Sequence, residues 1–305
     1  MDTGHIDTVA GACAERWRVD GEARRLFHGR GHCFAGLEHV VVTAFPPYVQ
    51  ISLFAEESPT MLDHLVDAVA TACAGAQGIA VQARDGRATS TRVWRGDVPE
   101  ECAVRENTLS FWVQPLRNQN VGLFLDMGHV RAALAPRVAG QRVLNLFAYT
   151  CAFSVSAIAH GAELVVNNDM SRNALALGER NHVLNGHDTR RVRMLPHNLF
   201  KSWWKVRQLG PYDVVIIDPP TNQRGSFVAE KSYGQILKRL PDFTAPGGLV
   251  LACLNSPFLD ADFLTGQMAR WCPACEFVER LPPHPDFPDR FPERALKVLE
   301  FVYRP

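Results

Sequence analysis

The sequence predicts an α/β protein, in which an open, doubly wound, largely parallel sheet follows a small α+β domain. After residue 116, short apolar segments alternate with helical segments at the spacing of parallel crossover units. Two further strand-like segments near the C-terminus have no helix between them, which permits an antiparallel return. Before residue 115, strand pairs surround one helix. We therefore expect two domains, 1–115 and 116–305.

In the first domain we expect a strand-strand-helix-strand-strand unit behind a basic leader that contains Arg24–Gly31. The expected strands are 40–44, 48–54, 102–105 and 109–113, and the expected helix is 59–76. Residues 84–97 are polar and rich in arginine, so we expect a loop there.

In the second domain the expected strands are 143–147, 164–168, 192–195, 213–217, 249–254, 276–281 and 297–303. The expected helices are 152–160, 172–185, 199–208 and 230–240. This is the outline of a nucleotide-type doubly wound sheet, whose ligands bind beyond the carboxyl ends of the strands.

Composition and charge exclude several classes of protein. Hydrophobic residues make up 47% of the chain, which is enough for packed cores. The 32 basic and 32 acidic side chains give no formal net charge, so any contact with nucleic acid must come from local patches. The start of the sequence lacks the features of a signal peptide, and no apolar run reaches about 18 residues. We expect a cytoplasmic protein with no membrane segment.

Eight cysteines are too dilute for a disulfide-stapled fold, and we expect mainly reduced, buried thiols. The spacing of Cys272 and Cys275 also admits a redox pair or half of a zinc site. Only His284 lies nearby as a further ligand, however. We interpret the pair as part of a turn before a strand and expect no metal site.

Polar residues follow the first two strands of the sheet. The turn 145–154 lacks the GxGxxG pattern, which argues against a dinucleotide ligand. Asp169 ends the next strand, where a carboxylate can accept hydrogen bonds from both hydroxyls of a ribose. Alternatively it caps the following helix, a role that Ser171 also suits. Met170 could cover an adenine or simply fill the core.

The third and fourth strands also end in polar residues. Asn198 could contact the edge of a base or cap a helix. The fourth strand runs into Asp218-Pro219-Pro220-Thr221, in which the two prolines fix the backbone and remove two donors. We interpret this segment as a rigid lip beside the reactive end of a ligand.

Residues 120–305 resemble class I S-adenosylmethionine-dependent methyltransferases of the bacterial large-subunit ribosomal RNA group. The closest likeness is to the guanine-N7 half of the bifunctional rRNA guanine methyltransferase. The first domain also resembles the small domain that precedes the catalytic domain in this group. The matching segments are Val121–Asp126, Leu144–Thr150, Asp169–Ser171, Asn181–Gly186, Asp218–Thr221 and Gly247-Gly248.

The resemblance implies a Rossmann-like, seven-stranded methyltransferase sheet that binds S-adenosyl-L-methionine. It implies that Phe147–Thr150 hold the methionine part, Asp169 the ribose and Met170 the adenine. The cofactor-binding residues it implies are Phe124, Asp126, Phe147, Tyr149, Thr150, Asp169, Met170, Asn198 and Leu199. The residues it implies at the methyl-transfer site are Asp218, Pro219, Pro220 and Asn255.

Three positions depart from the family pattern. Cys151 replaces a common glycine, which predicts a bulkier pocket wall, and Asn198 replaces an acid found in many members. Asn255 stands where cytosine-C5 members carry their catalytic cysteine, and we expect Cys253 to point elsewhere. Cytosine C5 needs a thiolate to add to the ring, whereas a purine nitrogen already has a lone pair. We therefore expect a purine nitrogen to be methylated.

Local charge favours RNA as a partner, although the chain as a whole is neutral. Residues 16–32 contain five Arg against two acids, and residues 84–97 contain four Arg against two acids. Phe27, Trp94 and Phe227 could stack on bases or pack in the core. We expect the loop Thr221–Lys231 to order over a target nucleotide.

The leading hypothesis is an S-adenosylmethionine-dependent methyltransferase of large-subunit rRNA. One alternative is a methyltransferase of a protein or small molecule, suggested by the neutral net charge. The other is a cofactor-binding protein without catalysis, suggested by Cys151.

Overall fold

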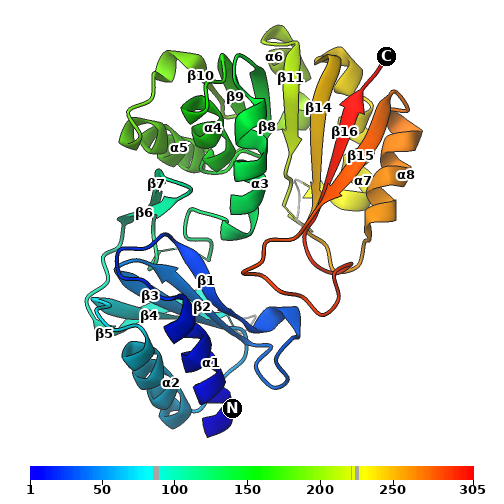
Figure 1. The fold of residues 1–305 in the computed structure, drawn as a ribbon. Coiled ribbons are helices and arrows are strands. Elements are labelled where there is room, and N and C mark those ends of the chain that lie inside the picture. Colours follow the sequence, from blue (N-terminus) through cyan, green and yellow to red (C-terminus); the bar gives the residue numbers. More distant parts are fainter. Residues whose placement is uncertain (85–88, 118, 221, 224–226) are drawn as a thin grey trace. The chain divides into compact units, whose positions relative to one another are not determined.

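Two units make up the chain in the computed structural model, and each is described by itself (Figure 1). The first comprises Met1–Gly128 with His284–Phe291, and the second comprises His129–Pro283 with Pro292–Pro305. The structure describes residues 1–84, 89–117, 119–220, 222–223 and 227–305. The first unit extends past the expected boundary at residue 115. One reason is that the Asn107 side chain donates to the Gly128 carbonyl at 2.8 Å.

The described part of the first unit contains a five-stranded sheet in the order β1-β2-β3-β4-β5. Its strands are β1 (Arg24–His28), β2 (Val40–Phe45), β3 (Tyr48–Leu53), β4 (Gly78–Arg84) and β5 (Thr89–Gly96). β3 and β4 are parallel, and the other neighbours are antiparallel. Two helices, α1 (Thr3–Arg16) and α2 (Pro59–Ala72), pack together in this unit. A separate hairpin pairs β6 (Cys102–Glu106) with β7 (Leu109–Val113).

The helix α2 forms where the sequence supplies both a start signal and an apolar face. The Ser58 hydroxyl accepts a hydrogen bond from the Met61 amide at 3.3 Å, and Pro59 occupies the first turn. The buried residues Leu62, Leu65, Val66 and Val69 follow the spacing of one helical face. They pack against buried side chains from α1 and the sheet.

Three expectations for this unit were wrong. Residues 84–97 were expected to form a loop, yet they contain β5, an edge strand whose side chains are mostly exposed. The basic leader likewise contains β1, the opposite edge strand. Edge strands pair on one side only and often carry charged residues, so an apolar pattern does not mark them. The third error concerns β6 and β7, which form their own sheet instead of completing the larger one.

The described part of the second unit is built around a seven-stranded sheet with the order β10-β9-β8-β11-β14-β16-β15. The first five strands in that order are parallel to their neighbours, and β16 is antiparallel to both β14 and β15. The strands are β8 (Arg142–Leu146), β9 (Leu164–Asn168), β10 (Val192–Leu195), β11 (Tyr212–Ile217), β14 (Thr244–Leu254), β15 (Cys275–Leu281) and β16 (Lys297–Tyr303). Two short strands, β12 (Asn222–Gln223) and β13 (Phe227–Val228), pair with each other.

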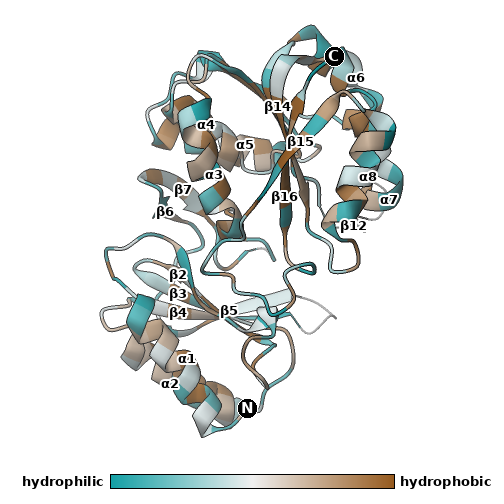
Figure 2. Cartoon of the chain, turned by 45° about the vertical axis from the view of Figure 1, so that its right-hand side comes forward, coloured by the Kyte–Doolittle hydropathy of each residue, from teal (hydrophilic) through white to brown (hydrophobic). Residues whose placement is uncertain are grey.

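Helices cover both faces of this sheet (Figure 1). They are α3 (Gly128–Leu134), α4 (Ala152–Ala159), α5 (Arg172–Leu184), α6 (Trp203–Gln208), α7 (Ala229–Leu237) and α8 (Ala261–Trp271). Leu146 and Ile217 belong to one hydrophobic cluster with residues of α7 and α8. Alternate strand residues point to the opposite face, where Asn167 meets Ser154 of α4. Hydropathy colouring shows the central strand β14 as largely hydrophobic (Figure 2).

The expected strands 164–168, 192–195 and 297–303 have the observed bounds of β9, β10 and β16. The prediction of one continuous helix over 199–208 was wrong. Ser202 separates a 3-10 turn, Leu199–Lys201, from the short helix α6. We did not predict α8, although Asp260 caps it by accepting a hydrogen bond from the Phe263 amide at 3.0 Å.

Candidate active site

The carboxyl ends of the parallel strands meet at one edge of the second sheet. In the strand register, Leu146 of β8 lies beside Asn168 of β9 on one side and Ile217 of β11 on the other. Leu195 of β10 lies beside Asn168 in turn. Neighbouring strands are about 4.8 Å apart, so the residues that follow these four strands gather along the same edge. Those residues include Phe147, Asp169, Asn198 and Asp218.

The turn after β8 has an unusual backbone. Phe147, Tyr149 and Cys151 have φ angles of 59°, 48° and 64°, in the left-handed region that favours glycine. Such conformations cost about 1–3 kcal/mol each and persist only where the surroundings enforce them. Alternating left-handed residues turn successive amide groups toward one side of the chain, an arrangement that suits a polar ligand.

The Asp169 carboxylate joins the turns that follow β8 and β9. One oxygen accepts a hydrogen bond from the Tyr149 amide at 2.9 Å, and the other accepts one from the Ser171 amide at 2.8 Å. Ser171 caps α5 by accepting a bond from the Ala174 amide at 3.2 Å, so Ser171 performs the capping role. Because each carboxylate oxygen has two lone pairs, Asp169 can accept further hydrogen bonds from a ligand.

Cys151 does not form the bulky pocket wall that we expected. Its side chain is fully buried, in a small cluster with Ala148 and Leu175, and its Sγ lies 3.9 Å from Sδ of Met194. Burial raises the pKa of the Cys151 thiol, and the nearby Asp169 charge adds to the rise. Gly178 of α5 makes room for it, since a Cβ on Gly178 would lie 2.4 Å from Cys151 Sγ. The thiol therefore points beneath the turn.

A chain of buried polar side chains runs under the same turns, and sequence reasoning missed it. The Asn145 amide donates to Asn167, and the Asn167 amide donates to the Ser154 hydroxyl, both at 2.9 Å. Ser154 Oγ in turn lies 2.9 Å from His182 Nε2. Burial, followed by the charge of His187, lowers the pKa of His182 to about 3, so the ring is neutral.

Asn181 connects α5 directly to the turn after β8. Its side-chain amide donates to the Thr150 carbonyl at 3.0 Å, and both residues are buried. Asparagines inside apolar strands, as at Asn145 and Asn167, were the signal in the sequence for this polar layer, because buried amides must find partners. The layer and Asn181 together hold the strained turn in place.

Asn198 and Leu199 follow β10. The Asn198 Oδ1 atom accepts a hydrogen bond from the Phe200 amide at 2.9 Å, which is the capping role. The Nδ2 group of such an amide can donate to the edge of a base. The Leu199 side chain lies in the hydrophobic core. By contrast, the Met170 side chain is 53% exposed at the strand-end edge, where it offers an apolar surface.

The Asp218-Pro219-Pro220 segment leaves β11 at this edge, with Asp218 and Pro220 half-buried and Pro219 buried. Thr221, which completes the sequence motif, lies outside the described residues, as do residues 224–226 of the loop Thr221–Lys231. Asn255 is exposed directly after β14. Cys253 is buried within β14, where its carbonyl accepts a hydrogen bond from the Tyr233 hydroxyl.

Other predicted contact residues belong to the first unit or lie in the hydrophobic core. Phe124 is 42% exposed, and Asp126 lies in a 3-10 turn; both belong to the first unit. Phe27 and Phe227 were considered as stacking platforms, but both are buried core residues. Trp94 is half-buried and donates from Nε1 to Asp63 at 2.9 Å.

A family model described as S-adenosylmethionine-dependent methyltransferase matches residues 24–302. The chain belongs to this family. Its cofactor is therefore S-adenosylmethionine, and the question is whether the residues at the carboxyl ends of the strands can bind it. The match begins at β1, so this methyltransferase family includes both units of the chain.

Two curated relatives carry the name Ribosomal RNA large subunit methyltransferase I. The protein of Aeromonas hydrophila is 35% identical over 179 residues, which cover 57% of this chain and 45% of that protein. The protein of Salmonella newport is 28% identical over 265 residues, which cover 82% of this chain and 65% of that protein. The chain thus spans about half to two thirds of the length of these relatives.

A solved structure is similar in fold. The crystal structure of SMU.776 complexed with SAH matches 99% of this methyltransferase and 82% of that chain, with a TM-score of 0.87 and 23% sequence identity. The two proteins therefore share a mixed α/β fold, in which helices flank a central sheet.

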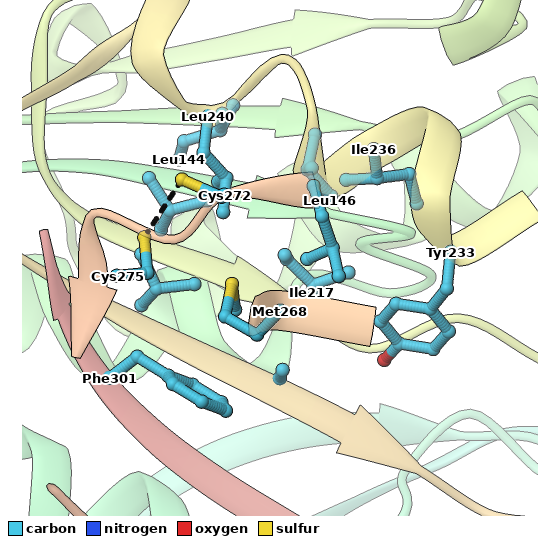
Figure 3. Close-up of a cluster of buried hydrophobic side chains, with 14 of the residues drawn as sticks. Leu144, Leu146, Ile217, Tyr233, Ile236, Leu240, Met268, Cys272, Cys275 and Phe301 are labelled. Carbon is cyan, nitrogen blue, oxygen red and sulfur yellow. Dashed lines mark hydrogen bonds between the residues drawn. The ribbon is translucent and has the colours of Figure 1, made fainter. Parts of the chain in front are cut away.

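Two of the cysteines were also considered as a redox pair or as metal ligands. None of the eight cysteines is in a disulfide bond, and six of them are buried. Cys272 and Cys275 lie in the core between α8 and β15 with 3.3 Å between their sulfur atoms (Figure 3). In the described part of the chain, no group of three His, Cys, Asp or Glu side chains could hold a metal ion. No helix among these residues is long and apolar enough to span a membrane.

Proposed function

We propose that this methyltransferase transfers a methyl group from S-adenosylmethionine to a purine nitrogen of large-subunit rRNA, guanine N7 being the first candidate. The observation that carries the proposal is the combination of Asp218-Pro219-Pro220 with an exposed Asn255, each directly after one of two neighbouring parallel strands. The names of the curated relatives support rRNA as the substrate. Ribosomal RNA is a cytoplasmic substrate in bacteria, which agrees with the expected location.

The residues along the edge fit the cofactor. Asp169 is half-buried and already oriented by two backbone amides, so its remaining lone pairs suit the ribose hydroxyls. Exposed Met170 suits the adenine ring, and Asn198 suits its polar edge. The turn Phe147–Thr150 suits the polar methionine part because its backbone is held in one strained shape. The assignment of Phe124 and Asp126 to the cofactor stays a prediction from the sequence.

The choice of a nitrogen rests on the lack of a usable thiol at Cys253, the cysteine nearest in sequence to Asn255. When bound, S-adenosylmethionine supplies an electrophilic methyl group. Cytosine C5 would accept it only after a thiolate had added to the ring, yet Cys253 is 1% exposed and lies within β14. A purine nitrogen needs only to be positioned in line with the methyl group. Asp218 and the rigid Pro219-Pro220 backbone are proposed to orient the base, and Asn255 to donate a hydrogen bond to it.

The two units take different roles in this proposal. The second unit, which corresponds to most of the predicted domain 116–305, carries the methyl-transfer residues. The first unit, which includes the predicted domain 1–115, binds RNA. The argument for a non-catalytic protein was a bulkier pocket wall at Cys151. That argument loses its basis, because the Cys151 side chain is buried beneath the turn.

The Asp218→Ala variant tests the proposal. We expect methyl transfer to protein-free large-subunit rRNA to fall by at least about a hundredfold, the size of effect expected of a residue that orients a reacting group. Cofactor affinity, measured by calorimetry, should remain close to that of the unaltered protein. Asp242→Ala, which removes an exposed carboxylate paired with Arg239 at 3.1 Å, is the matched control. Full activity of Asp218→Ala would refute the assigned role, and transfer to protein but not to rRNA would favour another substrate.

A further inference from the structure

Three arginines of the first unit gather around two phenyl rings. Arg25 lies on β1, Arg30 in the turn that follows it and Arg84 at the end of β4. The guanidinium carbons of Arg30 and Arg84 lie 3.9 and 4.7 Å from the centre of the same ring, that of Phe54. The guanidinium carbon of Arg25 lies 4.7 Å from the centre of the Phe287 ring. Stacking fixes the plane of each guanidinium group.

The cluster formed by Arg25, Arg30 and Arg84 concentrates positive charge. Burial lowers the pKa of Arg25 to about 10, and repulsion by the other two arginines adds to the effect. Burial, followed by repulsion from Arg30, also lowers the pKa of Arg84. Asp126 and Asp286 act on Arg25 in the opposite direction. Asp286, however, accepts two hydrogen bonds from Arg24, at 3.1 and 2.8 Å.

Two buried polar atoms beside the cluster have no hydrogen-bond partner among the described residues. They are Nε of Arg25 and Nδ1 of His28. Burial, with repulsion by Arg25 and Arg30, lowers the pKa of His28 to about 3, so its ring is neutral. An unpaired buried donor is uncommon in a folded protein, and each instance calls for an explanation such as a bound ion.

Two glycines fix the turn that carries Arg30. A Cβ on Gly29 would lie 1.8 Å from the Leu37 carbonyl oxygen, and one on Gly31 would lie 1.8 Å from the Pro288 carbonyl oxygen. No other residue type fits at either position without moving the backbone. Arg30, between them, is exposed. The turn therefore presents one arginine on a rigid support.

We propose that Arg25, Arg30 and Arg84 form a binding site for a backbone phosphate of RNA. Arginine presents several N–H donors in a fixed plane that matches the oxygens of a phosphate group. An anion here would relieve the repulsion between the arginines and could accept a hydrogen bond from Arg25 Nε. The exposed position of Arg30 makes the site open to a polymer as well as to a small ion. The inference rests on the proposed function, because it takes RNA as the substrate.

The test compares the variants Arg30→Gln and Arg84→Gln with Arg95→Gln. Arg95 is an exposed arginine of the same unit that pairs with Asp67 at 2.8 Å, which makes it a matched control. The probe is protein-free large-subunit rRNA, and its Kd is measured over a series of KCl concentrations. Each cluster variant should bind about five- to tenfold more weakly, and the slope of log K against log salt should fall by about 0.7–0.9 for each phosphate that is no longer neutralised. The Arg95→Gln variant should match the unaltered protein.

Two controls accompany the binding measurements. Melting curves show whether each variant folds, and S-adenosylmethionine affinity, measured without RNA, should be equal for all the proteins. Unchanged rRNA affinity and salt slope in both cluster variants would overturn the phosphate site while leaving the proposed function intact. Binding of inorganic phosphate at the cluster, with rRNA affinity unaffected by the variants, would overturn it in favour of a small-anion site. An unaltered protein that binds the cofactor but no rRNA would overturn the proposed function and this site together.

Discussion

The contact between Gly178 and Cys151 gives the sharpest prediction, because two simple arguments disagree about its sign. Gly178 lies within α5, where replacing glycine by alanine normally stabilises a helix by about 1 kcal/mol. In this protein the new Cβ would lie 2.4 Å from Sγ and 2.8 Å from Cβ of Cys151. Ordinary contacts between such atoms are at least 3.4 Å long.

The steric effect should exceed the gain in helix propensity. Cys151 Cβ is attached directly to a backbone held at φ 64°, so rotating the side chain cannot relieve the contact. Overpacking of this kind costs about 1–3 kcal/mol. We expect Gly178→Ala to lower the stability by about 1–2 kcal/mol after the helix gain is included, and to lower the Tm by about 2–8 °C. Displacement of the turn should also weaken cofactor binding about tenfold, or about 1.4 kcal/mol.

Thermal unfolding and calorimetric titration with S-adenosylmethionine measure both effects. The double variant Gly178→Ala with Cys151→Gly should recover most of the stability and affinity, since it removes both clashing atoms. The coupling energy between the two sites should then be about 1–3 kcal/mol. A higher Tm for Gly178→Ala alone would refute the reasoning and show that Cys151 does not limit the space beside α5.

Three further predictions concern the same unit. Asp169→Asn should weaken S-adenosylmethionine binding by at least about tenfold in calorimetry, because an amide can accept at one atom only and cannot keep the bonds to both Tyr149 and Ser171; unchanged affinity would contradict this. Cys253→Ala should keep the rate of methyl transfer within about twofold, because a purine nitrogen needs no thiol; loss of activity in the folded variant would indicate covalent catalysis. Acidification should reduce stability, because His182 has its pKa lowered from 6.5 to about 3 and only the unfolded chain binds the proton between these values. The slope should be about 1.4 kcal/mol per pH unit for this group, and denaturant titrations of His182→Gln should show a shallower dependence.

The strands of the second sheet were predictable because each contains a short apolar run between helical segments. The interior strand β9 and the edge strand β10 have the predicted bounds 164–168 and 192–195. Both edge strands of the first sheet were missed, since β1 and β5 are rich in arginine and β5 buries none of its side chains. A polar edge strand and a polar loop look alike in one sequence, because pairing with a neighbouring strand is what distinguishes them.

For the candidate site, the rule that ligands bind beyond the strand ends was enough to select Asp169, Asn198 and Asp218. The supports of the site could not be selected in this way. The bond from Asn181 to Thr150 and the space beside Gly178 depend on how α5 packs against the turn after β8. Cys151 shows the difference most clearly, because its identity predicted a bulkier pocket wall whereas its side chain is buried beneath the turn.

The most direct test of the account is transfer of a labelled methyl group from S-adenosylmethionine to large-subunit rRNA isolated from cells that lack this protein. The rRNA is then digested to nucleosides, and the labelled nucleoside is identified. The account predicts label on a purine methylated at nitrogen, with 7-methylguanosine as the first candidate. Label in 5-methylcytidine, or no label from a protein that binds the cofactor, would contradict it.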